Sequence, residues 1–187
     1  MRNKDFEKQN RIKEAMIQLI LQEGIDGTSM SKIAKRAGVS PSTIYVYYES
    51  KEDMLTEVFQ EYARKSYDYL MERIHPAMDT GELIGAIVKS CYHFSVEYKD
   101  IFSFVEQCSR CPSLSAGFSE KECSCNLLDL IHDYQANGAI QPFSDLNISA
   151  VLFAPVRFLA LNRQWLEKDE DAMLDELVQM LQRMLLK

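Results

Sequence analysis

The chain has 187 residues, of which 47% are hydrophobic, and a formal net charge of −7. This size and apolar content allow one or two small domains with a real core and argue against a disordered chain. No run of about 18 apolar residues occurs, and the polar N-terminal stretch lacks the apolar core of a signal peptide. The sequence therefore predicts a cytoplasmic protein without a membrane span.

The charge is unevenly distributed along the chain. Residues 1–51 hold nine Lys and Arg against six Asp and Glu, a net of +3. Residues 52–187 hold twelve against twenty-two, a net of −10. A mildly basic end on an acidic remainder suits a protein that presents this end to nucleic acid. A difference of this size also arises by ordinary scatter, so the charge alone does not decide.

The first predicted helix covers residues 4–23 and is ended by Gly24. Apolar side chains recur along it at helical spacing and form one stripe, which suits a helix that braces a neighbouring element. The stripe consists of Ile12, Ala15, Met16, Leu19 and Ile20.

Two short helices joined by a tight turn are expected next. Ser29 can cap the first, over residues 31–37, because a short hydroxyl accepts an N–H of the first turn. Gly38 then supplies the left-handed residue that ends a helix. Ser40 caps the second helix, and Pro41 fits its first turn, where a missing N–H costs nothing. This layout is a helix-turn-helix, whose second helix enters the major groove of DNA. The second helix would carry Ser42, Thr43, Tyr45, Tyr47 and Tyr48.

The remainder is predicted to be helical throughout, because no convincing strand alternation reaches five residues. A helix over residues 51–74, capped by Ser50, would connect the two parts of the chain. The predicted fold is therefore all-α, with a three-helix DNA-binding domain over residues 1–50 and a helical ligand-binding and dimerisation domain over residues 51–187. The other helices are expected at 82–98, 100–108, 120–137, 148–166 and 171–186.

The last two predicted helices are unusually apolar, and so wide an apolar face needs a partner. One interpretation is burial inside the body of the same chain. The other, which we favour, is that this pair also packs on its copy and forms a four-helix interface of a homodimer.

A family resemblance rests on the stretch GIDGTSMSKIAKRAGVSPSTIYVYYESKEDML. This stretch is similar to the DNA-binding head of the TetR family of transcriptional regulators. The family often has His-Phe where this chain has Tyr47-Tyr48, which keeps an aromatic anchor and a hydrogen-bonding tip. The resemblance implies an all-α homodimer whose heads bind two half-sites of a palindrome, and a body pocket whose occupancy moves the heads apart. The matching positions are Gly27-Thr28, Ile33-Ala34, Ala37-Gly38-Val39-Ser40, Thr43-Ile44-Tyr45, Ser50-Lys51-Glu52 and Leu55.

Contacts to double-stranded DNA would be made mainly to phosphate. A tyrosine hydroxyl at Tyr47 and the ammonium of Lys51 are the first candidates, and the helix start at Lys51 adds free N–H groups. The second short helix lacks the Arg, Asn and Gln side chains that best read base edges, so modest direct readout through methyl and ring contacts is expected. The full predicted set is Thr28, Ser29, Arg36, Ser40, Pro41, Ser42, Thr43, Tyr45, Tyr47 and Lys51.

Four cysteines have a spacing that resembles a zinc site: Cys108, Cys111, Cys123 and Cys125. Residues two apart on a helix point about 200° apart, so the last two converge only if their segment is not helical. Small reduced thiols in the protein interior are the plainer interpretation. A metal-sensing or redox-sensing regulator is the alternative function that these residues leave open, and no cofactor or resident metal is predicted.

Apolar and aromatic side chains of the body offer a lining for a small-molecule pocket, although at helical spacing they also fit a plain core. No nucleophile-base-acid arrangement or phosphate loop can be singled out, so an enzyme or carrier is disfavoured. The leading hypothesis is a repressor released from DNA by an unknown small-molecule inducer. The predicted pocket residues are Phe94, Tyr98, Phe102, Phe104, Tyr134, Phe158 and Trp165.

Overall fold

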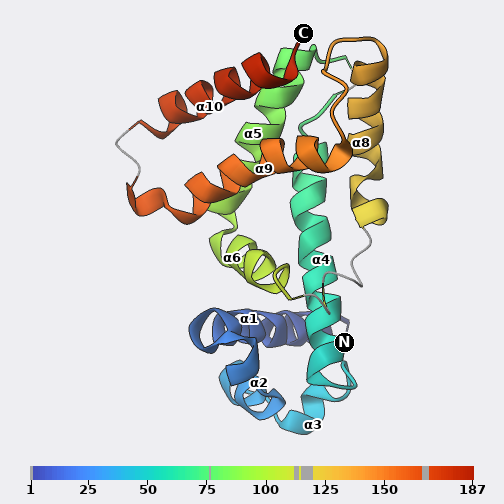
Figure 1. Cartoon of the computed structure of the whole chain (residues 1–187). Coiled ribbons are helices and arrows are strands. Elements are labelled where there is room, and N and C mark those ends of the chain that lie inside the picture. Colours follow the sequence, from blue (N-terminus) through green and yellow to red (C-terminus); the bar gives the residue numbers. More distant parts are fainter. Residues whose placement is uncertain (1, 76, 112–113, 115–119, 166–168) are drawn as a thin grey trace. The chain divides into compact units, whose positions relative to one another are not determined.

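A computed structural model describes residues 2–75, 77–111, 114, 120–165 and 169–187, with the side chains of residues 2–4 and 120–126 left aside. Within these ranges the protein is built from helices, as predicted (Figure 1). Pairing of extended backbone in the same ranges is limited to one bridge between Ile140 and Leu186. No helix in this part of the chain has both the length and the apolar character that a membrane span requires.

The chain divides into two compact units, which we call the head and the body. The head comprises Met1–Ala63 and Asp100–Phe118, and the body comprises Arg64–Lys99 and Ser119–Lys187. The division falls inside the helix that begins at Lys51, so this helix contributes its first turns to the head and its last turns to the body. The predicted division at residues 50 and 51 stays a prediction.

The head contains α1 (Arg2–Gly27), α2 (Met30–Ala37), α3 (Pro41–Ile44), the first part of α4 (Lys51–Met71) and all of α6 (Lys99–Cys108) except its first residue. The predicted stop at Gly24 is visible as a break inside α1, where this residue has φ 77° and ψ 172°. The apolar stripe of α1 faces the head core. The largest fully buried side chains there are Ile12, Met16, Ile20, Ile33, Ile44, Tyr48, Met54 and Phe104.

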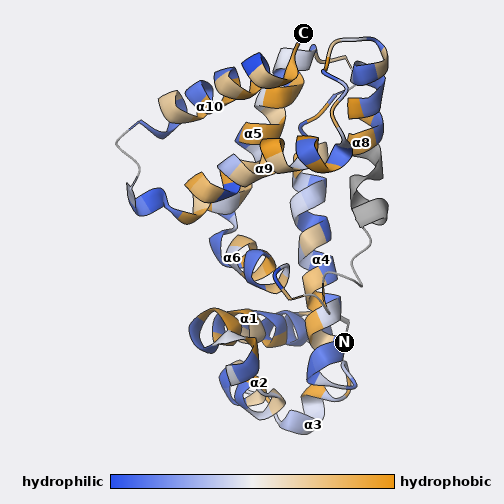
Figure 2. Cartoon of the chain, viewed as in Figure 1, coloured by the Kyte–Doolittle hydropathy of each residue, from blue (hydrophilic) through white to orange (hydrophobic). Residues whose placement is uncertain are grey.

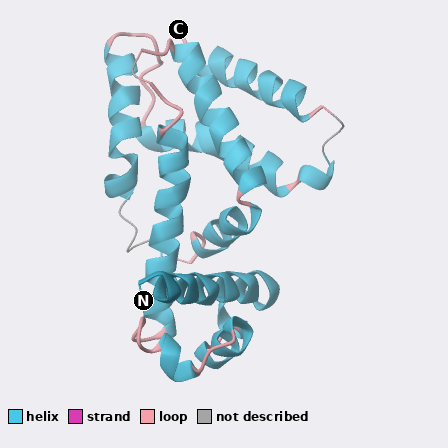
Figure 3. Ribbon diagram, turned by 180° about the vertical axis from the view of Figure 1, so that it is seen from behind, coloured by secondary structure: helices cyan, strands magenta, loops and turns pink. Residues whose placement is uncertain are grey.

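The body contains α5 (Thr80–Glu97), α8 (Glu120–Ala136), α9 (Asp145–Leu161), the 3-10 turn η1 (Arg163–Trp165) and α10 (Glu170–Leu185). Helix α5 is central to this unit, and both α9 and α10 pack on it (Figures 1 and 3). Its start is fixed by a capping box, in which Asp79 and Glu82 each accept the other's backbone N–H. Figure 2 shows how apolar residues concentrate along α5 and α9.

Candidate nucleic-acid interface

Helices α2 and α3 form the predicted helix-turn-helix. Ser29 caps α2 from extended backbone, and its hydroxyl accepts the N–H of Lys32 at 3.4 Å. Gly38 ends α2 in the left-handed region at φ 68°, which a residue without Cβ adopts without strain. The backbone N–H of Val39 then bonds to the carbonyl of Ala34 at 3.0 Å. The predicted cap and the predicted stop are both confirmed.

The second helix is shorter than predicted. It is helical only over Pro41–Ile44 and continues as hydrogen-bonded turns to Tyr48, whose N–H bonds to the carbonyl of Ile44 at 3.0 Å. The predicted extension as a helix through Tyr47 and Tyr48 was wrong. Four successive aromatic or β-branched residues follow Ile44, and the helix propensity of such residues is low.

The start of α3 carries a cluster of hydroxyl groups. Ser40 occupies the N-cap position, but its side chain makes no capping bond, contrary to the prediction. Its Oγ lies 2.8 Å from Oγ of Ser42 and 2.9 Å from Oγ1 of Thr43. Ser40, Pro41 and Ser42 are exposed and Thr43 is half-buried. This end of the head therefore presents short donors and acceptors to solvent.

The most exposed apolar side chains of the turn after α3 are Tyr45, at 56% exposure, and Val46, at 77%. The exposure of Tyr45 suits its predicted contact with DNA. Val46 was not among the predicted contact residues.

Tyr47 and Lys51, the two predicted phosphate anchors, both have partners inside the head. The Tyr47 hydroxyl donates to Oδ1 of Asp5 at 2.6 Å, and this hydrogen bond is the main reason that the pKa of Tyr47 is raised. The Lys51 ammonium donates to the carbonyl of Ile25 at 3.3 Å, and Lys51 is half-buried at the start of α4. Tyr47 would have to release Asp5 to donate to a phosphate, whereas Lys51 has two further N–H donors that can reach one while its bond to Ile25 persists.

Three other predicted positions differ in their surroundings. Thr28 is only 3% exposed, and its hydroxyl donates to the carbonyl of Gly24 at 2.9 Å. This burial gives no support to Thr28 as a DNA donor, and the residue instead fixes the turn before α2. Ser29 is exposed. Arg36 is exposed and donates to Oε1 of Gln22 at 2.8 Å.

The predicted pocket residues do not gather at one place within either unit. Phe102 and Phe104 belong to the head, where Phe104 is fully buried against Tyr62. The other five belong to the body. There Phe94 and Tyr98 contact each other and Tyr69. Tyr134 donates to the carbonyl of Met78, whereas Phe158 and Trp165 are 60% and 70% exposed.

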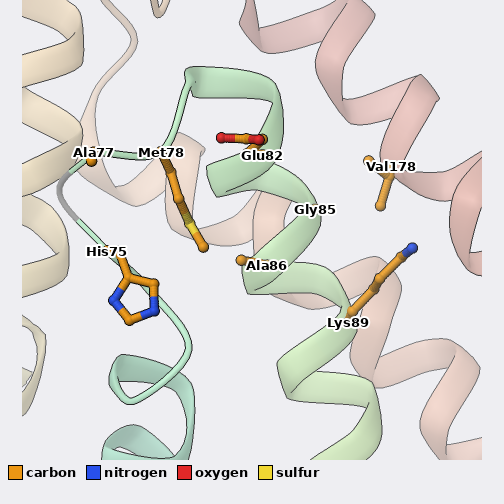
Figure 4. Close-up of a pocket in the computed structure, with 8 residues that line it drawn as sticks. All are labelled: His75, Ala77, Met78, Glu82, Gly85, Ala86, Lys89 and Val178. Carbon is orange, nitrogen blue, oxygen red and sulfur yellow. The ribbon is translucent and has the colours of Figure 1, made fainter.

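A hollow of about 560 Å³ opens elsewhere on the body (Figure 4). It lies between the loop before α5, the N-terminal half of α5, and α10. None of the predicted pocket residues lines it. The lining is mostly apolar, with an imidazole, a carboxylate and an ammonium at its edges. The Lys89 ammonium lies 2.7 Å from Oδ1 of Asp175. The lining residues are His75, Ala77, Met78, Glu82, Gly85, Ala86, Lys89 and Val178.

The cysteine pattern is only partly within the described residues. Cys108 is buried, and burial together with the charge of Cys111 raises the pKa of its thiol to about 12. The backbone of Cys123 and Cys125 is helical, which places these residues about 200° apart around α8. Their side chains lie outside the description. No group of three or more potential metal ligands occurs among the described residues.

Comparisons with known proteins agree with this geometry. Residues 12–58 match the family of bacterial regulatory proteins called the tetR family. The chain is 33% identical over 89 residues to the fatty acid metabolism regulator protein of Bacillus subtilis (strain 168), an alignment that covers 48% of the chain and 45% of that relative. A regulator named YvdT from the same organism is 27% identical over 94 residues, which covers 50% of the chain and 48% of the relative. The chain thus spans about half the length of these curated relatives.

Solved structures match over nearly the whole chain. A TetR family transcription regulator from Marinobacter aquaeolei VT8 has a TM-score of 0.89 at 24% identity and covers 100% of both chains. The fatty acid degradation regulator FadR from Bacillus halodurans has a TM-score of 0.73 at 26% identity and covers 93% of this chain and 94% of its own. FadR from Bacillus subtilis, solved in complex with stearoyl-CoA, has a TM-score of 0.70 at 22% identity and covers 92% of this chain and 97% of its own.

The helical fold and the capped pair of helices α2 and α3 define a helix-turn-helix DNA-binding regulator. Residues 12–58 belong to the TetR family of transcriptional regulators, and the whole chain shares the fold of a solved member of that family.

Proposed function

We propose that the protein is a repressor that binds a palindromic operator as a homodimer and leaves it when a small molecule occupies the body. The observation that carries the proposal is the head itself. A capped α2 and a left-handed turn at Gly38 lead to a short α3 whose start is rich in exposed hydroxyls. Such a dimer would act in the cytoplasm, where the bacterial chromosome lies, and would block transcription by occupying its operator.

In the proposed complex the turn after α3 faces the major groove. Exposed Tyr45 and Val46 suit apolar contact with thymine methyl groups, since neither side chain can make the bidentate hydrogen bonds that distinguish guanine or adenine. Ser42 and Thr43 would donate to the backbone or to base edges, and Tyr47 and Lys51 would hold phosphates. Specificity then depends on half-site spacing and DNA shape as well as on base contacts.

The proposed dimer forms through α9 and α10. Large apolar side chains on these helices and on η1 remain exposed in the single chain, and water-exposed apolar area of this kind favours a partner. Two copies of this helix pair would form a four-helix interface with isologous symmetry. The exposed large apolar residues of these elements are Leu146, Phe158, Leu161, Trp165, Met180 and Met184.

The proposed inducer is apolar and binds in the body. Of the predicted pocket residues, Phe94 and Tyr98 contact each other and Tyr69 inside the body, and this aromatic group is the proposed contact for an apolar ligand. Among relatives of similar fold, one was solved with stearoyl-CoA. Long-chain acyl-CoA is therefore the first ligand class to test on this chain.

The decisive experiment selects genomic DNA fragments on the purified protein and then screens compounds for release. Protection of two symmetric half-sites supports the repressor model, and failure to retain any fragment more strongly than random DNA contradicts it. Stearoyl-CoA, free coenzyme A and an apolar compound without the nucleotide form one arm. Diamide and a chelator form the other, because release by these alone would favour sensing through Cys108, Cys111, Cys123 and Cys125.

A further inference from the structure

The hydroxyl of Tyr47 has only one proton, and in this structure that proton is already used in a hydrogen bond within the head. It donates to Oδ1 of Asp5 at 2.6 Å, although the two residues are 42 positions apart in the chain. Asp5 is exposed in the first turn of α1. A tyrosine hydroxyl donates one hydrogen bond, and a phosphate oxygen can only accept. While the bond to Asp5 persists, Tyr47 therefore has nothing to donate to DNA.

We propose that Asp5 competes with a DNA phosphate for the Tyr47 hydroxyl and thereby sets the affinity of the head for DNA. The inference rests on the proposed function, because it requires Tyr47 to contact the DNA backbone. Binding exchanges one anionic acceptor for another at the same hydroxyl. The displaced carboxylate then remains near the phosphate, and the repulsion between the two charges lowers affinity further.

This competition acts alike on all DNA sequences. Phosphate contacts position a protein on the duplex but carry no sequence information directly. Asp5 therefore weakens operator binding and non-specific binding by the same factor. The effect is strongest at low ionic strength, because salt screens charges at an exposed surface.

The test compares Asp5→Ala with Glu7→Ala. Both changes remove one exposed carboxylate from the beginning of α1, but only Asp5 bonds to Tyr47. At low salt we expect Asp5→Ala to bind both the selected operator fragment and a random duplex about three- to tenfold more tightly, as suits one charge-assisted contact at an exposed site. Glu7→Ala should gain less than about twofold from its charge alone. Asp5→Asn keeps a weaker, neutral acceptor, so its gain in affinity should lie between those of Asp5→Ala and Glu7→Ala.

A double-mutant cycle isolates the hydroxyl. In a Tyr47→Phe background no proton remains to compete for, so the gain from Asp5→Ala should shrink to that of Glu7→Ala. An equal gain in both backgrounds, no gain over Glu7→Ala, or weaker binding by Asp5→Ala would each overturn the inference. Circular dichroism checks that the variants keep their helix content. A wild-type protein that retains no DNA overturns the proposed function itself, whereas normal wild-type binding with an unresponsive Asp5→Ala overturns only this inference.

Discussion

Lys13 on α1 and Glu61 on α4 form an ion pair within the head, with 2.5 Å between Nζ and Oε2. Lys13 is only 8% exposed, although lysine is rarely buried. Its partner's side chain is half exposed. The pair therefore links α1 to α4. Because only Lys13 is buried, we expect the loss of either partner to change the stability of the protein by a different amount.

Removing the charge of Glu61 should destabilise the protein more than removing the charge of Lys13. Glu61→Gln leaves a largely buried ammonium without its counter-charge, which we expect to destabilise the protein by about 1–3 kcal/mol, less than for a fully buried pair. Lys13→Met keeps the packing of the stem and leaves only a half-exposed carboxylate. Urea denaturation measures both, with Glu57→Gln as the control on an exposed position of α4. Equal losses from the two changes would contradict this account.

The glycines at 24 and 38 should differ from the glycine at 85. Gly24 and Gly38 have φ of +77° and +68°, whereas a Cβ at Gly85 would meet only Val178 Cγ1 at an ordinary 3.8 Å. Gly24→Ala and Gly38→Ala should each destabilise by about 1–3 kcal/mol, since alanine is strained at positive φ. Gly85→Ala should be neutral or stabilise by up to about 1 kcal/mol through lower chain entropy in the unfolded state. Thermal melts of the three variants provide the comparison.

His132 should make body stability depend on pH. Its ring lies 2.8 Å from Oδ1 of Asp145, and this hydrogen bond is the main reason that the pKa of His132 is raised. A group with a raised folded pKa contributes stability that is fully present below the unfolded value of 6.5 and is lost as pH rises through the folded pKa. Wild type should therefore be more stable than His132→Gln at acid pH, with the difference vanishing at alkaline pH. His93→Gln is the control, and a pH-independent difference would rule out the titration of His132.

Lys51 should contribute about one unit to the salt dependence of DNA binding. Lys51→Ala should weaken binding to all sequences and flatten the plot of log affinity against log salt by about one unit, as expected for one lost phosphate contact. Because the same ammonium donates to the carbonyl of Ile25, part of the loss will appear as lower stability of the head. Lys99→Ala, on an exposed lysine of the body, serves as the control. A salt slope unchanged from wild type would remove Lys51 from the interface.

Phe158 should be needed for the proposed dimer but not for the fold. It is 60% exposed on α9, so Phe158→Asp adds a charge without disturbing the core of a single chain. In a homodimer the charge occurs on both sides of the interface, and we expect dissociation to monomers and weaker operator binding. Sedimentation reports the mass, and Val96→Asp on α5 is the matched exposed control. A dimer that survives Phe158→Asp would place the interface elsewhere.

Local sequence rules were sufficient wherever neighbouring residues decide the structure. Ser29 and Gly38 mark the beginning and the end of α2, because a cap and a left-handed residue act within one turn of the chain. The all-helical fold likewise follows from apolar residues at helical spacing.

Only the tertiary structure decided which side chains remain available to a ligand. Tyr47 bonds to Asp5 across 42 positions, and Phe104 packs in the head although it was predicted with the aromatics of the body. The structure also decided that Val46 is 77% exposed and that Thr28 is only 3% exposed. A side chain's partners and its exposure are set by elements distant in the chain, whereas the sequence pattern around a residue specifies only its own helix or turn.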